Sequence, residues 1–157
     1  MTDYLNSLPI GKAETIKKTF SRRTSVRQSI QADPSIIWAL LTNAPDFSRW
    51  NSTVISIEGE IQKGQNIKLK SSLAPNRTFH IKIKEMIPEQ KMIWGDAMGQ
   101  RDFILEKKGN ATIFTMTEII GGLIFPLFAS QLPPFDEAFE QYAQDLKKEA
   151  EAIGQSK

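Results

Sequence analysis

The chain has 157 residues, enough for one domain but few for two, because a single core of this size already buries about two thirds of the surface of the unfolded chain. Hydrophobic residues make up 40% and charged residues 24%, as in ordinary globular proteins, and a net charge of +2 is too small for a nucleic-acid-binding surface. With no cysteine and one histidine, the chain cannot form a disulfide or a thiolate nucleophile, and we expect neither a metal site nor a cofactor.

The segment from Met1 to Gly11 lacks the charged-then-apolar pattern of a signal peptide. No stretch of the sequence approaches the roughly 18 apolar residues that a membrane-spanning helix needs. We therefore expect a cytoplasmic protein with no membrane span and no nucleic-acid partner.

Residues 1–21 show no sustained hydrophobic period, and they carry Lys12, Lys17 and Lys18 among small polar residues. We interpret this segment as a loosely held N-terminal arm, and a functional basic tail is the alternative. Residues 22–157 are then expected to form a single domain.

The first strand of that domain is expected near Arg22, because Val26, Gln28 and Ile30 alternate with polar neighbours. Asp33 and Pro34 then form the start signal of a helix, since an aspartate caps the first turn and a proline needs no hydrogen-bond partner there.

The helix that follows should turn one apolar stripe inward and end at Thr42-Asn43. A second short helix over residues 45–50 would place Phe47 and Trp50 on one face. Two small helices therefore separate the first strand from the rest of the sheet.

From Ser52 onward, strand-like segments are separated by short turn signals. These signals are Lys63-Gly64, Pro75-Asn76, Pro88-Glu89, Met98-Gly99 and Gly109-Asn110. Short connections predict antiparallel hairpins in a curved meander, because parallel neighbours need long crossovers. The apolar phase shifts between Ile83 and Met86, which predicts a β-bulge near Lys84-Glu85.

A long amphipathic helix closes the chain, between Pro133-Pro134 and Gly154. Its apolar residues recur every three or four positions from Phe135 to Ile153, so they share one stripe. Only the sheet is large enough to cover that stripe, because the two early helices are too short.

Three segments together carry a family resemblance: IQADPSIIWALLTNAPDFSRWN (30–51), RDFILEKKGNATIFTMTEIIGG (101–122) and LIFPLFASQLPPFDEAFEQYAQDLKKEAE (123–151). They resemble the polyketide cyclase/dehydrase and lipid-transfer proteins of the START-like superfamily, also called SRPBCC. The resemblance implies an α+β helix-grip fold, in which a seven-stranded antiparallel sheet wraps around the closing helix and leaves a hydrophobic cavity. It implies little about reaction, because that superfamily includes carriers as well as enzymes.

Hairpin pairing indicates which residues face this cavity. A turn at Gly109 would place Phe103 opposite Phe114, and a turn at Met98-Gly99 would place Trp94 beside Phe103. The residues expected to line the cavity or bind its ligand are Trp94, Asp96, Arg101, Phe103, Phe114, Met116, Glu118, Phe125, Phe128, Phe139 and Tyr142. For the aromatic residues Trp94, Phe103 and Phe114, ordinary core packing is the alternative.

The same pairing predicts a charged cluster of Asp96, Arg101 and Glu118 at the cavity mouth, because an unpaired buried charge is costly. Arg101 could then bind a carboxylate, phenolate or carbonyl of a ligand, and a solvated rim is the alternative. His80 shares a face with Lys82 and Lys84, so we expect it on the solvent side.

The apolar segment 123–128 follows Gly121 and Gly122, a candidate hinge. Its side chains, including Phe125 and Phe128, should fold inward as a lid over the cavity. A static plug and a homodimer contact are the alternatives.

The resulting functional hypothesis is a protein that binds a small hydrophobic molecule, either aromatic, polyketide-like, sterol-like or acyl. One alternative is an enzyme of cyclase or dehydratase type in the same cavity, where only Glu118, Asp96 and Tyr142 are placed for acid/base chemistry. A protein-interaction module is the other.

Overall fold

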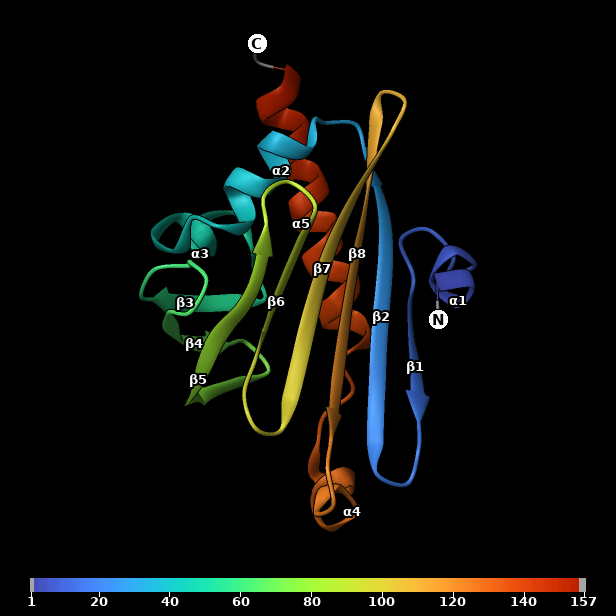
Figure 1. The fold of residues 1–157 in the computed structure, drawn as a ribbon, viewed down its shortest axis with the longest axis vertical. Helices are drawn as coiled ribbons and strands as arrows, with labels where there is room; N and C mark the ends of the chain where they lie inside the picture. The colour runs from blue at the N-terminus through green and yellow to red at the C-terminus, as the bar shows by residue number, and fades with distance from the viewer. Residues whose placement is uncertain (1, 156–157) are drawn as a thin grey trace.

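The computed structural model describes residues 2–155, and within that range the chain forms one eight-stranded antiparallel sheet with a long helix along one face (Figure 1). The elements in chain order are α1 (Thr2–Asn6), β1 (Ala13–Lys17), β2 (Ser21–Ile30), α2 (Pro34–Leu41), η1 (Ala44–Asp46), α3 (Phe47–Trp50), β3 (Val54–Glu58), β4 (Asn66–Ser71), β5 (Ala74–Ile87), β6 (Lys91–Gly95), β7 (Gly99–Lys108), β8 (Ala111–Gly121), α4 (Phe125–Phe128), η2 (Ala129–Gln131) and α5 (Asp136–Gln155).

The sheet order is β1-β2-β8-β7-β6-β5-β4-β3. Strands β3 to β8 form the expected meander, and β2 pairs with the last strand of that meander rather than with β3. The chain crosses from β2 to the opposite edge of the sheet through α2, η1 and α3. These helices therefore cover part of the sheet face on which α5 also lies (Figure 1).

The strand count corrects the expectation of seven, because the segment assigned to a loose arm contributes β1. This strand pairs with β2 from Ala13 opposite Val26 to Lys17 opposite Arg22. The helices consequently lie between the second and third strands, not between the first two. The sequence pattern misses β1 because it is a short edge strand with no buried residue.

The signals at the start of α2 are confirmed. The Asp33 carboxylate accepts a hydrogen bond from the Ser35 N–H at 3.0 Å, and Pro34 takes the first helical position. This hydrogen bond also holds the pKa of Asp33 below its ordinary value. The second predicted helix is split at Phe47 into a 3₁₀ turn, η1, and one α-helical turn, α3.

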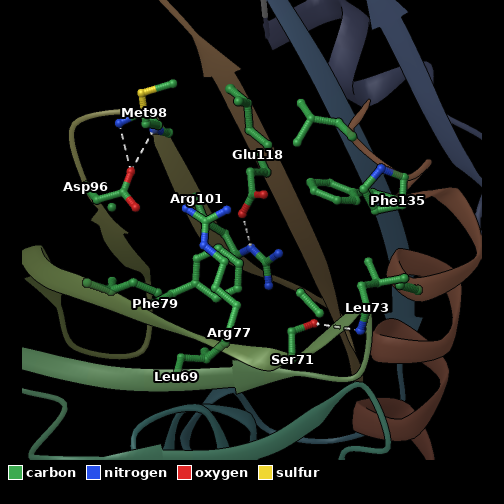
Figure 2. A pocket seen from close by; sticks show the side chains of 18 of the residues that line it. Leu69, Ser71, Leu73, Arg77, Phe79, Asp96, Met98, Arg101, Glu118 and Phe135 are labelled. Atoms are coloured by element: carbon green, nitrogen blue, oxygen red, sulfur yellow. Dashed lines mark hydrogen bonds and ion pairs between the residues drawn. The ribbon is translucent and has the colours of Figure 1, made fainter. Parts of the chain in front are cut away.

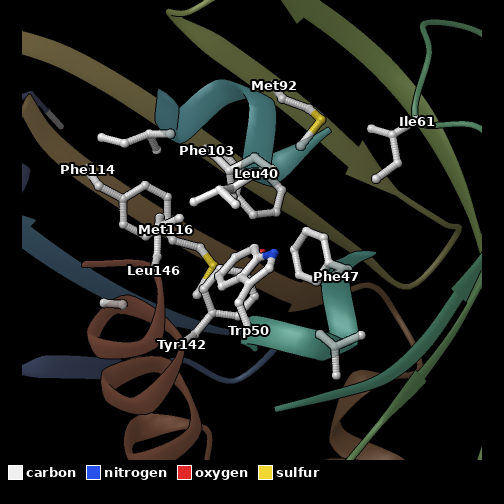
Figure 3. Packing of buried hydrophobic residues seen from close by; sticks show 14 of the residues in the cluster. Leu40, Phe47, Trp50, Ile61, Met92, Phe103, Phe114, Met116, Tyr142 and Leu146 are labelled. Atoms are coloured by element: carbon white, nitrogen blue, oxygen red, sulfur yellow. The ribbon is translucent and has the colours of Figure 1, made fainter. Parts of the chain in front are cut away.

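The buried core is centred on an aromatic group between α3, α5 and the sheet (Figure 3). Phe47 and Trp50 of α3 lie 6.0 and 6.3 Å from the Tyr142 ring of α5, measured between ring centroids. Phe103 and Phe114 lie 6.3 Å from the same ring on the sheet side. Tyr142 is thus the point at which the helices and the sheet meet.

The turn at Gly109-Asn110 contains two residues, so Lys108 pairs directly with Ala111. The expected register instead placed Glu106 opposite Ala111, so it differs from the observed pairing by two residues along β7. Gly109 adopts a φ of 60°, which suits the tight turn that right-twisted strands prefer. Because side chains alternate with a period of two, the error leaves each residue on its predicted face but gives it a different partner.

In the observed register Phe103 lies opposite Met116, Leu105 opposite Phe114 and Arg101 opposite Glu118. The β6–β7 hairpin is displaced from the prediction in the same way, with Trp94 opposite Arg101. Arg101 and Glu118, which the expected register would have placed diagonally, are therefore direct cross-strand partners.

The turn expected at Pro75-Asn76 is also wrong, because residues 72 and 73 connect β4 to β5. Pro75 lies inside β5, where the pairing is interrupted between Leu69 opposite Phe79 and Ser71 opposite Ala74. A proline is tolerated there because no ladder hydrogen bond is required of it. The bulge predicted near Lys84-Glu85 is confirmed by a register shift between Ile83 and Glu85.

Acidic side chains fasten α5 to backbone N–H groups of other elements. Glu140 accepts from Ala13 at 2.9 Å, Asp145 from Ser52 at 2.8 Å, and Glu151 from Gln31 at 2.8 Å. The helix is thereby held to the sheet along most of its length. Among residues 2–155, no helix is both long and apolar enough to cross a membrane.

Candidate functional site

A cavity of about 710 Å³ lies between the first half of α5, strands β4 to β8 and the α4 segment. Its volume is within the roughly 300–1,000 Å³ that is typical of small-molecule sites. Most of the side chains around it are apolar, among them Leu69, Phe79, Trp94, Ile120, Leu132 and Phe139. The expected hollow between sheet and helix is therefore present.

Arg101 and Glu118 form an ion pair on the cavity wall (Figure 2). The two residues are direct cross-strand partners on β7 and β8, and the Arg101 Nε donates to Glu118 Oε1 at 2.7 Å. Their side chains are only 18% and 17% exposed, so each charge depends on the other for compensation.

The guanidinium of Arg101 also lies over two aromatic rings of α5. Its central carbon is 5.0 Å from the Phe139 ring centroid and 5.8 Å from that of Tyr142. Such cation–π contacts hold a guanidinium in place while leaving its edge free to donate hydrogen bonds. Arg101 is therefore fixed at the boundary between the apolar cavity and the charged pair.

Asp96 lines the cavity, but its carboxylate has a different role from the one expected. One oxygen accepts hydrogen bonds from the N–H groups of Met98 and Gly99 at 2.8 and 3.0 Å, which stabilises the β6–β7 turn. No ion pair joins Asp96 to Arg101 among the residues that the structure describes. The expected three-residue cluster is thus a two-residue pair with a separate turn cap.

The eleven residues expected at the site fall into two groups. The cavity is lined by Trp94, Asp96, Arg101, Glu118, Phe128, Phe139 and Tyr142. The others, Phe103, Phe114, Met116 and Phe125, are buried in packed surroundings outside the cavity lining. For Phe103 and Phe114 the alternative of core packing holds, because both side chains are buried and both rings pack near the ring of Tyr142.

Tyr142 contributes its ring to the cavity wall and buries its hydroxyl. The residue is 2% exposed, and among the described residues its O–H has no hydrogen-bond partner. Burial raises the pKa of Tyr142 above its ordinary value, because the phenolate would be poorly solvated. The hydroxyl is accordingly neutral at physiological pH.

The apolar segment after β8 folds inward only in part. Phe125 is buried against Phe128, with ring centroids 5.5 Å apart, and Ile124 and Phe128 line the cavity. Leu123 and Leu127 are 90% and 79% exposed, contrary to the expectation for this segment. Leu127 lies in the single turn of α4 and Leu123 in the turn before it, and the burial of Phe125 and partial burial of Phe128 leave both leucines on the solvent side.

Arg77 is the main cavity residue that the sequence analysis missed. Because a turn was predicted at Pro75-Asn76, Arg77 was not assigned to the strand in which it lies. The parity of β5 provides a usable signal, because Arg77 lies two residues before Phe79 and therefore shares its inward face. Its guanidinium lies over the Phe79 ring, 4.7 Å from the centroid (Figure 2).

Arg22 is a second charged residue that the pattern did not identify. It is buried on the inner face of β2, with its guanidinium 4.4 Å from the Phe135 ring centroid. Burial lowers the pKa of Arg22, while the negative charges of Glu118 and Asp136 oppose that effect. Glu118 therefore feels positive charge from both β2 and β7.

His80 is exposed, as the strand parity predicts, and borders a second, smaller pocket with Lys68 and Lys70 that shares no lining residue with the cavity. Within the described part of the chain, no three His, Cys, Asp or Glu side chains are grouped in a way that could hold a metal ion.

Comparison with known proteins identifies the fold. No family profile matches the chain, and no curated protein matches it in sequence. Solved structures do match. A protein from Rhodobacter sphaeroides superposes with a TM-score of 0.67 at 16% identity, over 90% of this chain and 99% of that one.

Two further matches have names. DynU16 from the dynemicin biosynthetic locus has a TM-score of 0.63 at 14% identity, over 86% of this chain and 49% of that one. The solution structure of the Aha1 dimer from Colwellia psychrerythraea has a TM-score of 0.59 at 20% identity, over 84% of this chain and 96% of that one. At these identities the similarity establishes the fold alone.

Proposed function

We propose that this protein binds a small hydrophobic molecule in the cavity between the sheet and α5, as a helix-grip protein of the START-like superfamily. The observation that carries the proposal is the cavity of about 710 Å³ with a mostly apolar wall and a few polar groups, the usual composition of a ligand site. Trp94, Phe128 and Phe139 would contact the apolar body of the ligand.

The contacts that the titratable side chains already make within the protein favour binding over catalysis. General acid/base chemistry needs a titratable group that is free to exchange a proton with the ligand. Glu118 is held by Arg101, Asp96 caps a turn, and the Tyr142 hydroxyl is buried. The proposed function is therefore non-catalytic, and the cyclase or dehydratase alternative has no comparable support.

The fold matches support a small-molecule ligand in a limited way, since DynU16 comes from a biosynthetic locus. The Aha1 match is a dimer, and the exposed Leu123 and Leu127 of this chain offer an apolar surface for self-association. We include a homodimer through α4 as a second candidate.

The binding proposal is tested by filling the cavity. Ala138 lines the cavity from α5, so Ala138→Phe places a ring inside it. Ala152 is exposed on the same helix, and Ala152→Phe is the matched control. The neutral dye N-phenyl-1-naphthylamine would report occupancy by fluorescence titration.

We expect wild-type protein and Ala152→Phe to bind the dye with equal affinity, and Ala138→Phe to bind it at least about tenfold more weakly, a loss of about 1.4 kcal/mol. Binding by Ala138→Phe at wild-type affinity would place the dye elsewhere and contradict the proposal. Native mass spectrometry of the same samples would separate a bound small molecule from a dimer.

A further inference from the structure

Four charged side chains line the cavity: Arg77, Asp96, Arg101 and Glu118. Three of them are engaged within the protein. Arg101 pairs with Glu118 at 2.7 Å, and Asp96 accepts two backbone N–H groups. Among the described residues, no carboxylate lies within ion-pair distance of Arg77, so its charge is the one without a counter-ion.

Arg77 is exposed to solvent and lines the cavity from β5. The side chain projects from the inner face of β5, and its guanidinium is held over the Phe79 ring at 4.7 Å. Contact with an aromatic face uses none of the N–H donors of a guanidinium, which remain available at its edge. Figure 2 shows Arg77 and Arg101 reaching into the same site from different strands.

A neutral apolar ligand would be a poor match for this arrangement. Such a ligand would displace water from the Arg77 guanidinium without replacing its hydrogen bonds, which weakens binding. A cationic ligand would be repelled by Arg77, and both carboxylates of the wall are already engaged, Asp96 by two backbone N–H groups and Glu118 by Arg101. A carboxylate satisfies Arg77, because its two oxygens match the guanidinium fork.

We propose that the ligand is an amphipathic carboxylic acid, with its apolar body in the cavity and its carboxylate bound by Arg77. This inference rests on the proposed function and specifies the ligand class. One unpaired guanidinium corresponds to one negative charge, which favours a monoacid over a phosphate or a diacid. The Arg101–Glu118 pair then forms a neutral section of the wall rather than the anion site.

The test compares two probes that differ only at the polar end, decanoate and decanol, by isothermal titration calorimetry. Proteins to be measured are the wild type, Arg77→Gln, Arg77→Lys and Arg27→Gln. Arg27 donates to the Asn6 carbonyl outside the cavity, so Arg27→Gln is a control with the same change of net charge. Circular dichroism would verify that each variant is folded.

We expect the wild type and Arg27→Gln to bind decanoate at least about tenfold more tightly than decanol, as a charge-assisted hydrogen bond predicts. Arg77→Gln should lose this preference while keeping its affinity for decanol, and Arg77→Lys should keep part of it. Raising the salt concentration should weaken decanoate binding only.

Equal binding of the two probes by the wild type, or equal weakening of both in Arg77→Gln, would overturn the carboxylate site and leave the hydrophobic cavity intact. Failure of both probes to bind the wild type would overturn the proposed function together with this inference.

Discussion

Glu140 on α5 accepts a hydrogen bond from the backbone N–H of Ala13 on β1 at 2.9 Å, across 127 positions of sequence. One helical turn earlier, Asp136 accepts a hydrogen bond from the Thr15 hydroxyl at 2.5 Å. These contacts join the closing helix to the edge strand of the sheet. The α5 carboxylates thereby stabilise a strand that has no buried side chain of its own.

Removing the Glu140 carboxylate should loosen β1. We expect Glu140→Ala to lower the free energy of unfolding by about 1 kcal/mol, the usual net value of a partly buried hydrogen bond. Hydrogen exchange should become faster at Ala13 and its strand neighbours. Gln144→Ala, at an exposed position of the same helix, is the control and should leave both measurements unchanged. Unaltered exchange in Glu140→Ala would show that β2 alone holds β1.

This relationship explains why β1 could not be predicted from the sequence. Strand and helix patterns arise from neighbouring residues, as in β2 or at the Asp33 cap, and both of those were predicted correctly. The pairing of Ala13 with Glu140 has no local pattern, because it depends on how the finished helix lies against the sheet. Elements held by distant contacts therefore escape a reading of the sequence.

Breaking the Arg101–Glu118 pair from either side should destabilise the fold. Their side chains are 18% and 17% exposed, so we expect a loss of about 2 kcal/mol for Arg101→Leu or Glu118→Leu, between the values for surface and fully buried pairs. The double variant should lose less than the sum, because it leaves neither charge alone. Urea denaturation of the four proteins would measure this coupling, and strictly additive losses would argue against it.

Removing the hydroxyl of Tyr142 should stabilise the fold, whereas breaking the Arg101–Glu118 pair should destabilise it. Because this buried O–H has no hydrogen-bond partner among the described residues, Tyr142→Phe should raise the free energy of unfolding by about 1 kcal/mol. Tyr4→Phe removes a hydroxyl that donates to Glu14 at 3.1 Å, so it should change stability by less than about 0.5 kcal/mol. A clear loss of stability in Tyr142→Phe would reveal a partner such as a buried water.

Glu151 should contribute to stability only above acidic pH. Partial burial acts to raise the pKa of Glu151, but the Gln31 N–H and the Lys147 ammonium outweigh it, so the pKa lies below its ordinary value of 4.5. A lowered folded pKa favours the folded state while the carboxylate is charged. The contribution is therefore complete above about pH 4.5 and disappears as the pH falls through the lowered pKa.

Glu151→Gln should accordingly be less stable than the wild type at pH 7, and the difference should shrink on acidification. Chemical denaturation at a series of pH values would measure it. Glu106→Gln removes an exposed carboxylate of β7 and serves as the control. A difference between Glu151→Gln and the wild type that is constant with pH would contradict the linkage.

Changing the exposed leucines in and just before α4 should leave the fold intact. Leu123 and Leu127 are 90% and 79% exposed. The free energy of unfolding of the Leu123→Ser, Leu127→Ser double variant should therefore differ from that of the wild type by less than about 0.5 kcal/mol. Sedimentation velocity should show weaker self-association if these residues form a dimer contact. Identical sedimentation of the two proteins across concentrations would remove the α4 dimer from consideration.

The candidate site was predicted in composition better than in arrangement. Alternation placed Trp94, Arg101 and Glu118 on the inner face correctly, because parity survives a register error of two. The register error did change the predicted contact partners. Asp96 was predicted to pair with Arg101, but its carboxylate accepts hydrogen bonds within its own turn. Arg77 was lost because Pro75-Asn76 resembles a turn, although the strand continues through an irregular stretch.

The fastening of α5 also determines how a guest molecule is exchanged with solvent. Carboxylates tie the helix to Ala13, Ser52 and Gln31, so moving it away would break contacts at several places at once. The opposite rim consists of the β4–β5 connection and the segment after Gly122, whose φ of 135° few residues other than glycine adopt. Entry and exit should therefore proceed by displacement of that rim, with the helix remaining in position as a fixed wall.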